Sequence, residues 1–406
     1  MTRTTYLFAC ALGALVLATV AAGAASETGV TSSQVVIGGT TPLSGPASAY
    51  QSVAKGAAAY FRYVNAHGGV NKRKIKYIYK DDGYDPSKTV DKTRELVQQD
   101  KVFAIFNSLG TEHNLATRAY LNALKIPQLF VASGATTFGT NYKQYPWTIG
   151  YQPNYRAEGT IYGRYVAKTN PKARIGVLYQ NDDYGKDLLA GLRNGLGKKA
   201  KLIKSKQSYD VTDDQVQSQV ARLKAAKVNT LMLFATPKFA IQMYVYANKL
   251  GWRPRVYVNA VSSAANIMGL ATAGTSKKQT EGSLSIVFLK DPTDPKWKHD
   301  AAMRMYRSIM KRYAPSANAN DVYHVYGMAA AWTAVEAIRK AGKNLTRDGL
   351  MKVVTTMNLS GNPFLLPGIG LKTGAGDHFP IEQMVLQRWH KGTWKSFGGI
   401  WGYRTA

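Results

Sequence analysis

The chain has 406 residues, a length that usually corresponds to two or three domains and excludes a single miniature core. Hydrophobic residues make up 45% of it and charged residues 19%, which is typical of a globular protein and excludes disorder as the main state. Lysine and arginine total 53 against 24 acidic residues, a formal net charge of +29, so acidic partners have to be considered. Cys10 is the single cysteine, which excludes internal disulfides and multi-cysteine metal sites.

Residues 1–24 have the features of a secretory signal peptide. Arg3 supplies the positive end, an apolar run extends from Tyr6 to Val20, and Ala22-Gly23-Ala24 offers small residues for cleavage. A retained membrane anchor is the alternative, but the run is shorter than the roughly 20 residues of a spanning helix. Cys10 precedes most of the apolar run, so a lipoprotein site is not expected there. We predict that residues 1–24 are removed during export.

From residue 34 onward, short β-rich runs alternate with helical patterns, as in α/β proteins with parallel sheets. The alternation occurs about four times before residues 145–147 and starts again at Arg174, which predicts two similar lobes. Two helical stripes are expected to face the core: Val216, Val220 and Leu223, and Ala240, Met243, Ala247 and Leu250. The predicted strands are Gln34–Gly38, Ile75–Lys80, Val102–Phe106, Gln128–Val131, Arg174–Tyr179, Thr230–Phe234 and Arg255–Val258.

After residue 282 the pattern changes. A strand is predicted near residues 283–288, followed by long helical segments at about 295–313 and 321–341 and a short helix near 347–356. A Gly/Pro-rich stretch covers residues 361–376, and a terminal hairpin is predicted from residues 382–389 and 394–403. Such a late helical block indicates a chain that returns to lobes it left earlier.

The motifs that carry common chemistries are missing from the sequence. There is no P-loop, no Gly-x-Ser-x-Gly elbow and no Gly-x-Gly-x-x-Gly after a strand. The six histidines never stand at metal-ligand spacing, and Glu112-His113 is a lone doublet. Asp81-Asp82 and Asp182-Asp183 each follow a strand, where aspartate commonly caps the next turn. We therefore expect no catalytic residues, no metal and no cofactor.

The basic excess raises the question of nucleic acid. Clusters occur at Lys72-Arg73-Lys74 and between Lys198 and Lys206, but no nucleic-acid-binding motif accompanies them. Solvated basic faces are the better interpretation, and no nucleic-acid partner is expected. A basic field would still favour small anions as they approach the protein.

Several motifs resemble the leucine/isoleucine/valine-binding proteins of ABC importers. They are residues 37–46 (IGGTTPLSGP), 65–70 (NAHGGV), 81–86 (DDGYDP) and 175–185 (IGVLYQNDDYG). The resemblance covers nearly the whole mature chain in order and spacing. It implies an α/β protein with the type I periplasmic binding fold, in which three crossing segments join two doubly wound α/β lobes around a ligand cleft. The implied lobes are residues 31–150 with 285–356, and residues 151–284 with 357–406.

Two loops are candidates for gripping a ligand, because open α/β sheets bind ligands beyond the carboxyl ends of their strands. Residues 108–111 follow one predicted strand and begin a helix, whose amides can hold an anion. Residues 132–137 follow the next strand and offer hydroxyls and unhindered backbone; plain turn chemistry is the alternative for each residue. In the resembled family such loops bind the ligand carboxylate. The candidates are Ser108, Leu109, Gly110, Thr111, Ser133, Ala135 and Thr136.

Four further positions follow from the resemblance. Tyr50 and Tyr184 match aromatic cleft walls of the two lobes, whereas Thr236 stands where the amino-acid binders carry an aromatic residue. Ala260 lies in a stretch, residues 259–263, without the glutamate that pairs with a ligand ammonium in the family. A desolvated ammonium without an anionic partner is costly. We therefore expect a carboxylate without an α-amine, unless an acid from elsewhere in the cleft restores the amino-acid interpretation.

These features predict a monomeric periplasmic solute-binding protein, not an enzyme, that delivers a small organic ligand to an ABC transporter permease. The ligand would be an aliphatic or aromatic carboxylate, or a branched-chain amino acid. Binding would act by hinge closure, which a ligand favours when it contacts both lobes only in the closed form. The alternatives are a ligand-sensing module that reports to a membrane receptor, and a secreted hydrolase, for which no nucleophile and base are evident.

Overall fold

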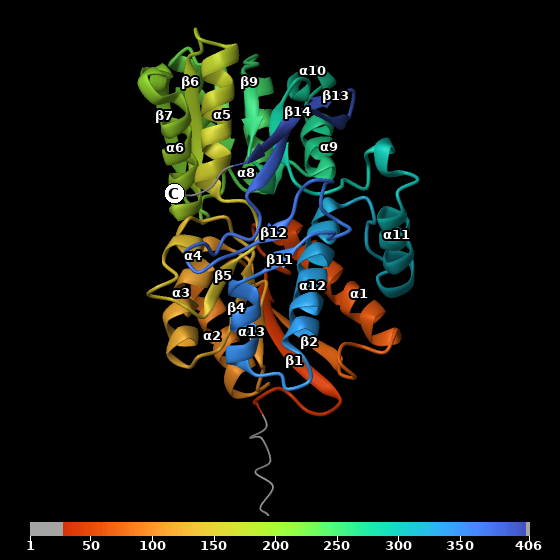
Figure 1. Cartoon of the computed structure of the whole chain (residues 1–406). Coiled ribbons are helices and arrows are strands. Elements are labelled where there is room, and N and C mark those ends of the chain that lie inside the picture. The colour runs from red at the N-terminus through yellow and green to blue at the C-terminus, as the bar shows by residue number, and fades with distance from the viewer. Residues whose placement is uncertain (1–26, 403–406) are drawn as a thin grey trace, which may run out of the picture.

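The computed structural model describes residues 27–402, which form two α/β lobes (Figure 1). The predicted signal peptide, including Cys10, lies outside the described residues, as does residue 403 of the predicted hairpin. The fold is the predicted one, with parallel sheets covered by helices. None of the helices between residues 27 and 402 is long and apolar enough to cross a membrane.

The first lobe contains a five-stranded parallel sheet in the order β2-β1-β3-β4-β5. This doubly wound order places a topological switch point, and hence a ligand-binding edge, at the carboxyl ends of its strands. The last strand, β5, has only three residues and was not predicted. The elements of this lobe are β1 (Gln34–Thr41), η1 (Ser48–Tyr50), α1 (Gln51–Ala66), β2 (Lys74–Asp81), α2 (Pro86–Gln98), β3 (Ala104–Phe106), α3 (Thr111–Ala123), β4 (Gln128–Val131), α4 (Thr137–Thr140) and β5 (Thr148–Gly150).

The second lobe contains a seven-stranded sheet in the order β14-β13-β10-β9-β8-β6-β7. Neighbouring strands pair parallel except at β13, which pairs antiparallel with β10 on one side and with β14 on the other; β13 and β14 form the predicted terminal hairpin. The elements are α5 (Tyr155–Thr169), β6 (Ile175–Gln180), α6 (Asp183–Leu196), η2 (Gly197–Leu202), β7 (Ile203–Tyr209), α7 (Gln217–Ala225), β8 (Thr230–Phe234), α8 (Pro237–Lys249), β9 (Arg255–Val258), η3 (Ala260–Ser262), α9 (Ala265–Ala273), α10 (Lys277–Thr280), β10 (Leu284–Val287), β13 (Gln383–His390) and β14 (Thr393–Gly402).

The segment after β10 returns to the first lobe, where helix α12 packs against α1. The lobe boundary predicted between residues 284 and 285 falls inside strand β10. The whole of β10 belongs to the sheet of the second lobe. The helix predicted at 295–313 is interrupted, since the Asp300 side chain accepts a hydrogen bond from the Met303 amide and starts a new helix. The elements are η4 (Pro295–Trp297), α11 (Ala301–Tyr313), α12 (Val322–Ala341), α13 (Arg347–Thr355), β11 (Asn358–Leu359) and β12 (Leu371–Lys372).

The predicted core stripes on α7 and α8 are buried as expected, except for Leu250, which caps α8 and is half-buried. Strand β7 was missed because its polar residues alternate between half-buried and exposed positions at the edge of the sheet. A β-rich, apolar run is therefore the wrong signal for such an edge strand.

Helices α5 and α6 lie in close contact at the cleft side of the second lobe. A side-chain carbon on Gly191 of α6 would lie 2.1 Å from the Arg156 carbonyl oxygen of α5, so only glycine permits this approach. The close contact fixes the first turns of both helices relative to each other. Those turns carry residues that line the cleft, and the packing therefore builds one wall of the candidate site.

Candidate ligand-binding site

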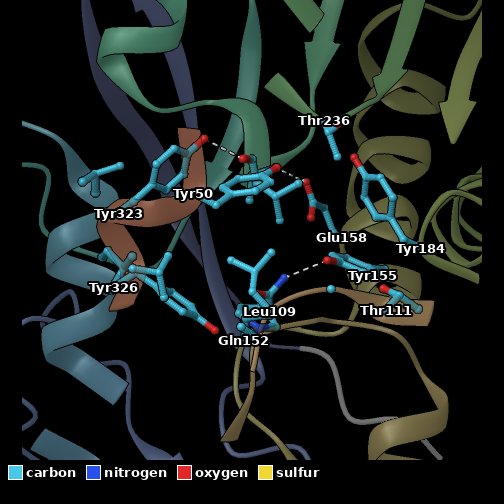
Figure 2. A pocket seen from close by; sticks show the side chains of 18 of the residues that line it. Tyr50, Leu109, Thr111, Gln152, Tyr155, Glu158, Tyr184, Thr236, Tyr323 and Tyr326 are labelled. Atoms are coloured by element: carbon cyan, nitrogen blue, oxygen red, sulfur yellow. Dashed lines mark hydrogen bonds between the residues drawn. The ribbon is translucent and has the colours of Figure 1, made fainter. Parts of the chain in front are cut away.

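A cavity of about 100 Å³ lies between the two lobes (Figure 2). Its wall combines strand-end loops of the first sheet, the first turns of α5 and α6, and residues of α12 from the returning segment. The cavity is smaller than an engineered cavity of about 150 Å³ that holds benzene, so in this arrangement of the lobes it restricts the ligand to a small molecule. Seven of the eleven predicted site residues line the cavity: Tyr50, Leu109, Gly110, Thr111, Tyr184, Thr236 and Ala260.

The first-lobe wall centres on the start of α3. Gly110 caps this helix with a φ of +113°, and a side-chain carbon there would lie 2.2 Å from Nδ1 of His113. Both observations require glycine. The first amides of a helix have no intrahelical acceptor, and they carry the positive end of the helix dipole. This wall can therefore hold a carboxylate through the backbone.

The other predicted residues of the two loops lie behind this wall. Ser133 Oγ is 2.7 Å from Thr111 Oγ1 and accepts a hydrogen bond from the Ala135 amide. Ser108 Oγ accepts from the Thr40 amide, tying the loop to β1. Ser108, Ser133 and Ala135 are buried and do not line the cavity in this structure. They position Thr111 and its neighbours.

Thr136 contacts the opposite lobe instead of the cavity. Its amide donates to Oδ2 of Asp187 on α6, at 2.7 Å. A second link joins the Tyr323 hydroxyl of α12 to the carbonyl oxygen of Val261, also at 2.7 Å. A third joins the Asp183 amide to Glu112 Oε1, at 3.4 Å. These hydrogen bonds hold the lobes in a closed arrangement.

Aromatic rings form much of the cavity wall. The predicted Tyr50 packs edge-on against Tyr323, and the predicted Tyr184 packs edge-on against Tyr155, with ring centroids 5.2 and 4.9 Å apart. Burial raises the pKa of each of these tyrosines well above its usual value, so all stay uncharged near neutral pH. Further aromatic residues that the sequence did not indicate are Tyr84, Phe288 and Tyr326.

Two tyrosine hydroxyls have no partner in this wall. The buried hydroxyls of Tyr50 and Tyr326 make no hydrogen bond of good geometry to another described residue, although Ser262 lies beside the first and Asn107 beside the second. A buried hydroxyl without a partner is costly, and a ligand that carries an acceptor would remove that cost. Tyr326 lies one turn after Tyr323 on α12; this spacing was the only signal in the sequence, and a core helix produces the same pattern.

The second-lobe wall carries the one acidic side chain among the residues that line the cavity, Glu158 of α5. It is 2% exposed. Its Oε1 accepts from the Ala260 amide and lies 2.7 Å from the Tyr162 hydroxyl. Burial raises its pKa from 4.5 to about 7. The absence of an acid at residues 259–263 therefore does not leave the cavity without one.

Thr236 and Ala260 complete this side of the cavity. The Thr236 amide donates to the Tyr209 hydroxyl at 2.9 Å, which fixes the loop after β8. No lysine, arginine or histidine lines the cavity among residues 27–402, and no group of three metal-ligating side chains occurs in the same range. The arrangement suits reversible binding of a small, largely apolar molecule with one polar end.

The two lobes, the switch-point loops and the cavity between them define an interlobe ligand-binding protein. Residues 34–393 match the family model described as periplasmic binding protein. The chain belongs to the periplasmic binding protein family, as the motifs had predicted. A curated relative is the Leu/Ile/Val-binding protein homolog 2 of Brucella abortus, 24% identical over 371 residues that cover 90% of this chain and 92% of the relative.

Solved structures share the fold. A fatty acid ABC transporter substrate-binding protein from Thermomonospora curvata has a TM-score of 0.78 at 20% identity, covering 93% of this chain and 95% of that one. A branched-chain amino acid ABC transporter from Thermus thermophilus with bound valine has a TM-score of 0.77 at 18% identity, covering 91% of this chain and 97% of that one. A solute-binding protein from R. palustris in complex with benzoate has a TM-score of 0.74 at 15% identity, covering 90% of this chain and 96% of that one.

Proposed function

We propose that this protein captures a small carboxylate without an α-amine in the periplasm and delivers it to an ABC importer. The observation that carries the proposal is the composition of the cavity: aromatic walls, a helix N-terminus at one end, and one acidic side chain, Glu158, whose charge burial disfavours, among the described lining residues. The structural relatives that carry valine or benzoate, or are named for fatty acids, support small organic acids as the ligand class.

Capture works by closure of the two lobes. The ligand carboxylate binds at the start of α3, around Gly110 and Thr111, and the tyrosine rings of both lobes cover its apolar part. Each lobe alone offers only a part of these contacts. A ligand therefore stabilises the closed form, because it binds that form more tightly than the open one. The hydrogen bonds from Thr136 to Asp187 and from Tyr323 to Val261 stabilise the closed form further.

A branched-chain amino acid is the second candidate ligand. Glu158 favours it, because an ionised carboxylate in the cavity would pair with an ammonium. The first candidate is preferred because Glu158 sits fully buried among uncharged partners, an environment that disfavours its charge.

The proposal includes a cleaved leader, a monomeric mature protein and an ABC permease as partner. Its support is the sequence of residues 1–24 and membership in the family. Intact-mass analysis of exported protein tests the leader. We expect the mass of a chain that begins near Ala25. The mass of a chain that retains residues 1–22, or that carries an acylated Cys10, would contradict the cleavage.

A thermal-shift screen tests the function. Only a ligand that binds the folded state raises its melting temperature. We expect 4-methyl-2-oxopentanoate or benzoate to raise it more than leucine does. Failure of every acid, amide and amino acid in the screen would contradict the proposed function.

A further inference from the structure

The environment of Glu158 indicates which protonation state it adopts. Three groups surround the Tyr162 hydroxyl oxygen: Glu158 Oε1 at 2.7 Å, the Val258 carbonyl oxygen at 2.9 Å and the Ile286 amide nitrogen at 3.2 Å. The Ile286 amide brings its own proton. Tyrosine has a single proton to donate, and two oxygen atoms stand at hydrogen-bond distance to receive it.

Counting protons resolves this arrangement. The Val258 carbonyl can only accept, so Tyr162 must donate to it if their 2.9 Å contact is a hydrogen bond. The 2.7 Å contact between Tyr162 and Glu158 then needs a proton from the glutamate. If Glu158 were ionised, Tyr162 would donate to it, and two oxygen atoms would face each other at 2.9 Å with no proton between them. The geometry favours a protonated Glu158.

No positively charged side chain among the described residues that line the cavity would hold Glu158 ionised; the contacts with Tyr162 and the Ala260 amide lower its pKa, but burial raises it by more. The titratable groups that face it are Tyr155 and Tyr162 on its own helix, Tyr184 on α6 and Tyr50 on η1, and burial raises the pKa of all four. From η3 and β10 the neighbours are the Ala260 and Ile286 amides. Arg156 on the same helix pairs instead with Asp187. Burial accordingly raises the pKa of Glu158 to about 7.

The second carboxyl oxygen of Glu158 is available to a ligand. Figure 2 shows the Glu158 carboxyl between the rings of Tyr50 and Tyr184, with one oxygen hydrogen-bonded and the other directed into the cavity. An uncharged acid in this place does not repel a carboxylate ligand. It also offers no counter-charge to an ammonium, whose desolvation would then be uncompensated.

We infer that Glu158 shares a proton with Tyr162 and enters the cavity as an uncharged acid, which admits a monocarboxylate and rejects an ammonium. This inference rests on the proposed function, because it assigns the ligand charge for the same cavity. It makes Glu158 the residue that determines specificity, and it couples binding to pH. Ionisation of Glu158 would place a second negative charge beside a bound carboxylate.

The first experiment needs no ligand. In full-length exported protein labelled with 13C at the glutamate side-chain carboxyls, the Glu158 resonance is identified by its loss in Glu158→Gln. We expect this resonance to titrate near pH 7. Titration near pH 4.5, the ordinary range of a glutamate, would overturn the inference, whatever the protein binds.

The second experiment measures the Kd of 4-methyl-2-oxopentanoate, benzoate and leucine from pH 6 to 8.5. For the two acids we expect Kd to rise about tenfold per pH unit above 7, as required for one proton, and to stay level in Glu158→Gln. Asp182→Asn is the matched control, because Asp182 is a second acid with a pKa raised by burial, to about 6, at the start of α6. It should retain the wild-type profile.

The outcomes separate this inference from the proposed function. Acids that bind with the same Kd at every pH would overturn the inference and leave the transport function intact. Leucine binding that is equally tight at pH 6 and pH 8.5 would also overturn it, because the acid that holds the ammonium would then already be ionised at pH 6. If no probe binds while Glu158 still titrates near 7, the shared proton stands and the proposed function fails.

Discussion

The two walls of the cavity hold a ligand by different means. In the first-lobe wall, backbone amides at the start of α3, at Gly110 and Thr111, face the polar end of the cavity, Ser108 and Ser133 support them from behind, and tyrosine rings such as Tyr50 line the rest. The second-lobe wall works through side chains, chiefly Glu158 and Tyr184.

This difference separates general affinity from selectivity. Helix N-termini attract any anion of suitable size, so under the proposed function the first wall recognises the carboxylate that many ligands share. The charge and shape of the remaining ligand are decided by side chains of the second wall, which one substitution can change. Four variants test that division.

The largest expected effect concerns Glu158 and pH. Its pKa is about 7 in the folded protein against 4.5 unfolded, so between these pH values the folded state keeps a proton that the unfolded state has lost. The free energy of unfolding should therefore fall as pH rises from 4.5 to 7, by about 3 kcal/mol in total. Urea unfolding of wild type and Glu158→Gln over this range measures this contribution: we expect the fall in the free energy of unfolding to be smaller by about this amount in the variant, while Asp182, whose pKa is raised to about 6, keeps its own share. Parallel curves for the two proteins would contradict the burial of an uncharged acid.

Gly110→Ala tests the backbone wall. The positive φ and the approach to His113 should together cost about 2–3 kcal/mol of stability, and carboxylate binding should be lost because the α3 amides move. Gly68→Ala is the matched control, since Gly68 has a φ of +93° with no atom near the added carbon. If the two variants bind carboxylates with the same Kd and have the same free energy of unfolding, the position of the α3 amides does not matter for binding. That result would contradict the proposed difference between the two walls.

Tyr184→Ala removes a ring from the second wall. Carboxylate binding should weaken by about 2 kcal/mol, the value of a buried aromatic contact, as measured by calorimetry. Tyr184→Phe keeps the ring and loses only the hydrogen bond to Asn259, at 3.0 Å, so it should weaken binding less. Undiminished affinity in the alanine variant would remove Tyr184 from the site.

Asp187→Asn weakens a link between the lobes without touching the cavity. Its carboxylate accepts from the Thr136 amide and pairs with Arg156. We expect every bound acid to lose about 0.5–1 kcal/mol, with no change in the ranking of ligands, because the variant affects closure alone. A changed ranking, measured by calorimetry with the same set of acids, would show that Asp187 also determines selectivity.

The sequence predicted the fold, and it predicted part of the first-lobe lining of the cavity. Gly110 and Thr111 could be identified because they follow a strand, and the end of a parallel strand has a defined place in a doubly wound sheet. The same rule also selected Ser108 and Ser133, because chain order gives the loop but not which side chain turns to the cavity. Their hydrogen bonds turn them behind the wall.

The second wall was predicted only in part, at Tyr184, Thr236 and Ala260. Glu158 belongs to the first turn of α5, where an acidic residue also favours the helix dipole. Its role depends on the packing of α5 against α6 and on the position of Tyr162, and both arise from contacts between distant parts of the chain. Tyr323 and Tyr326 were missed for a similar reason, since a helix buried on nearly all sides gives no sign of which face meets a cavity.

Calorimetric titration of leucine and its deaminated analogue 4-methyl-2-oxopentanoate at pH 6.5 tests the central claim most directly, because the two ligands differ mainly in the amine. We predict that the oxo acid binds and that leucine binds more weakly or not at all, since Glu158 is uncharged and no other described acid lines the cavity. Micromolar binding of leucine with no binding of the oxo acid would contradict the claim and make Glu158 the ammonium partner.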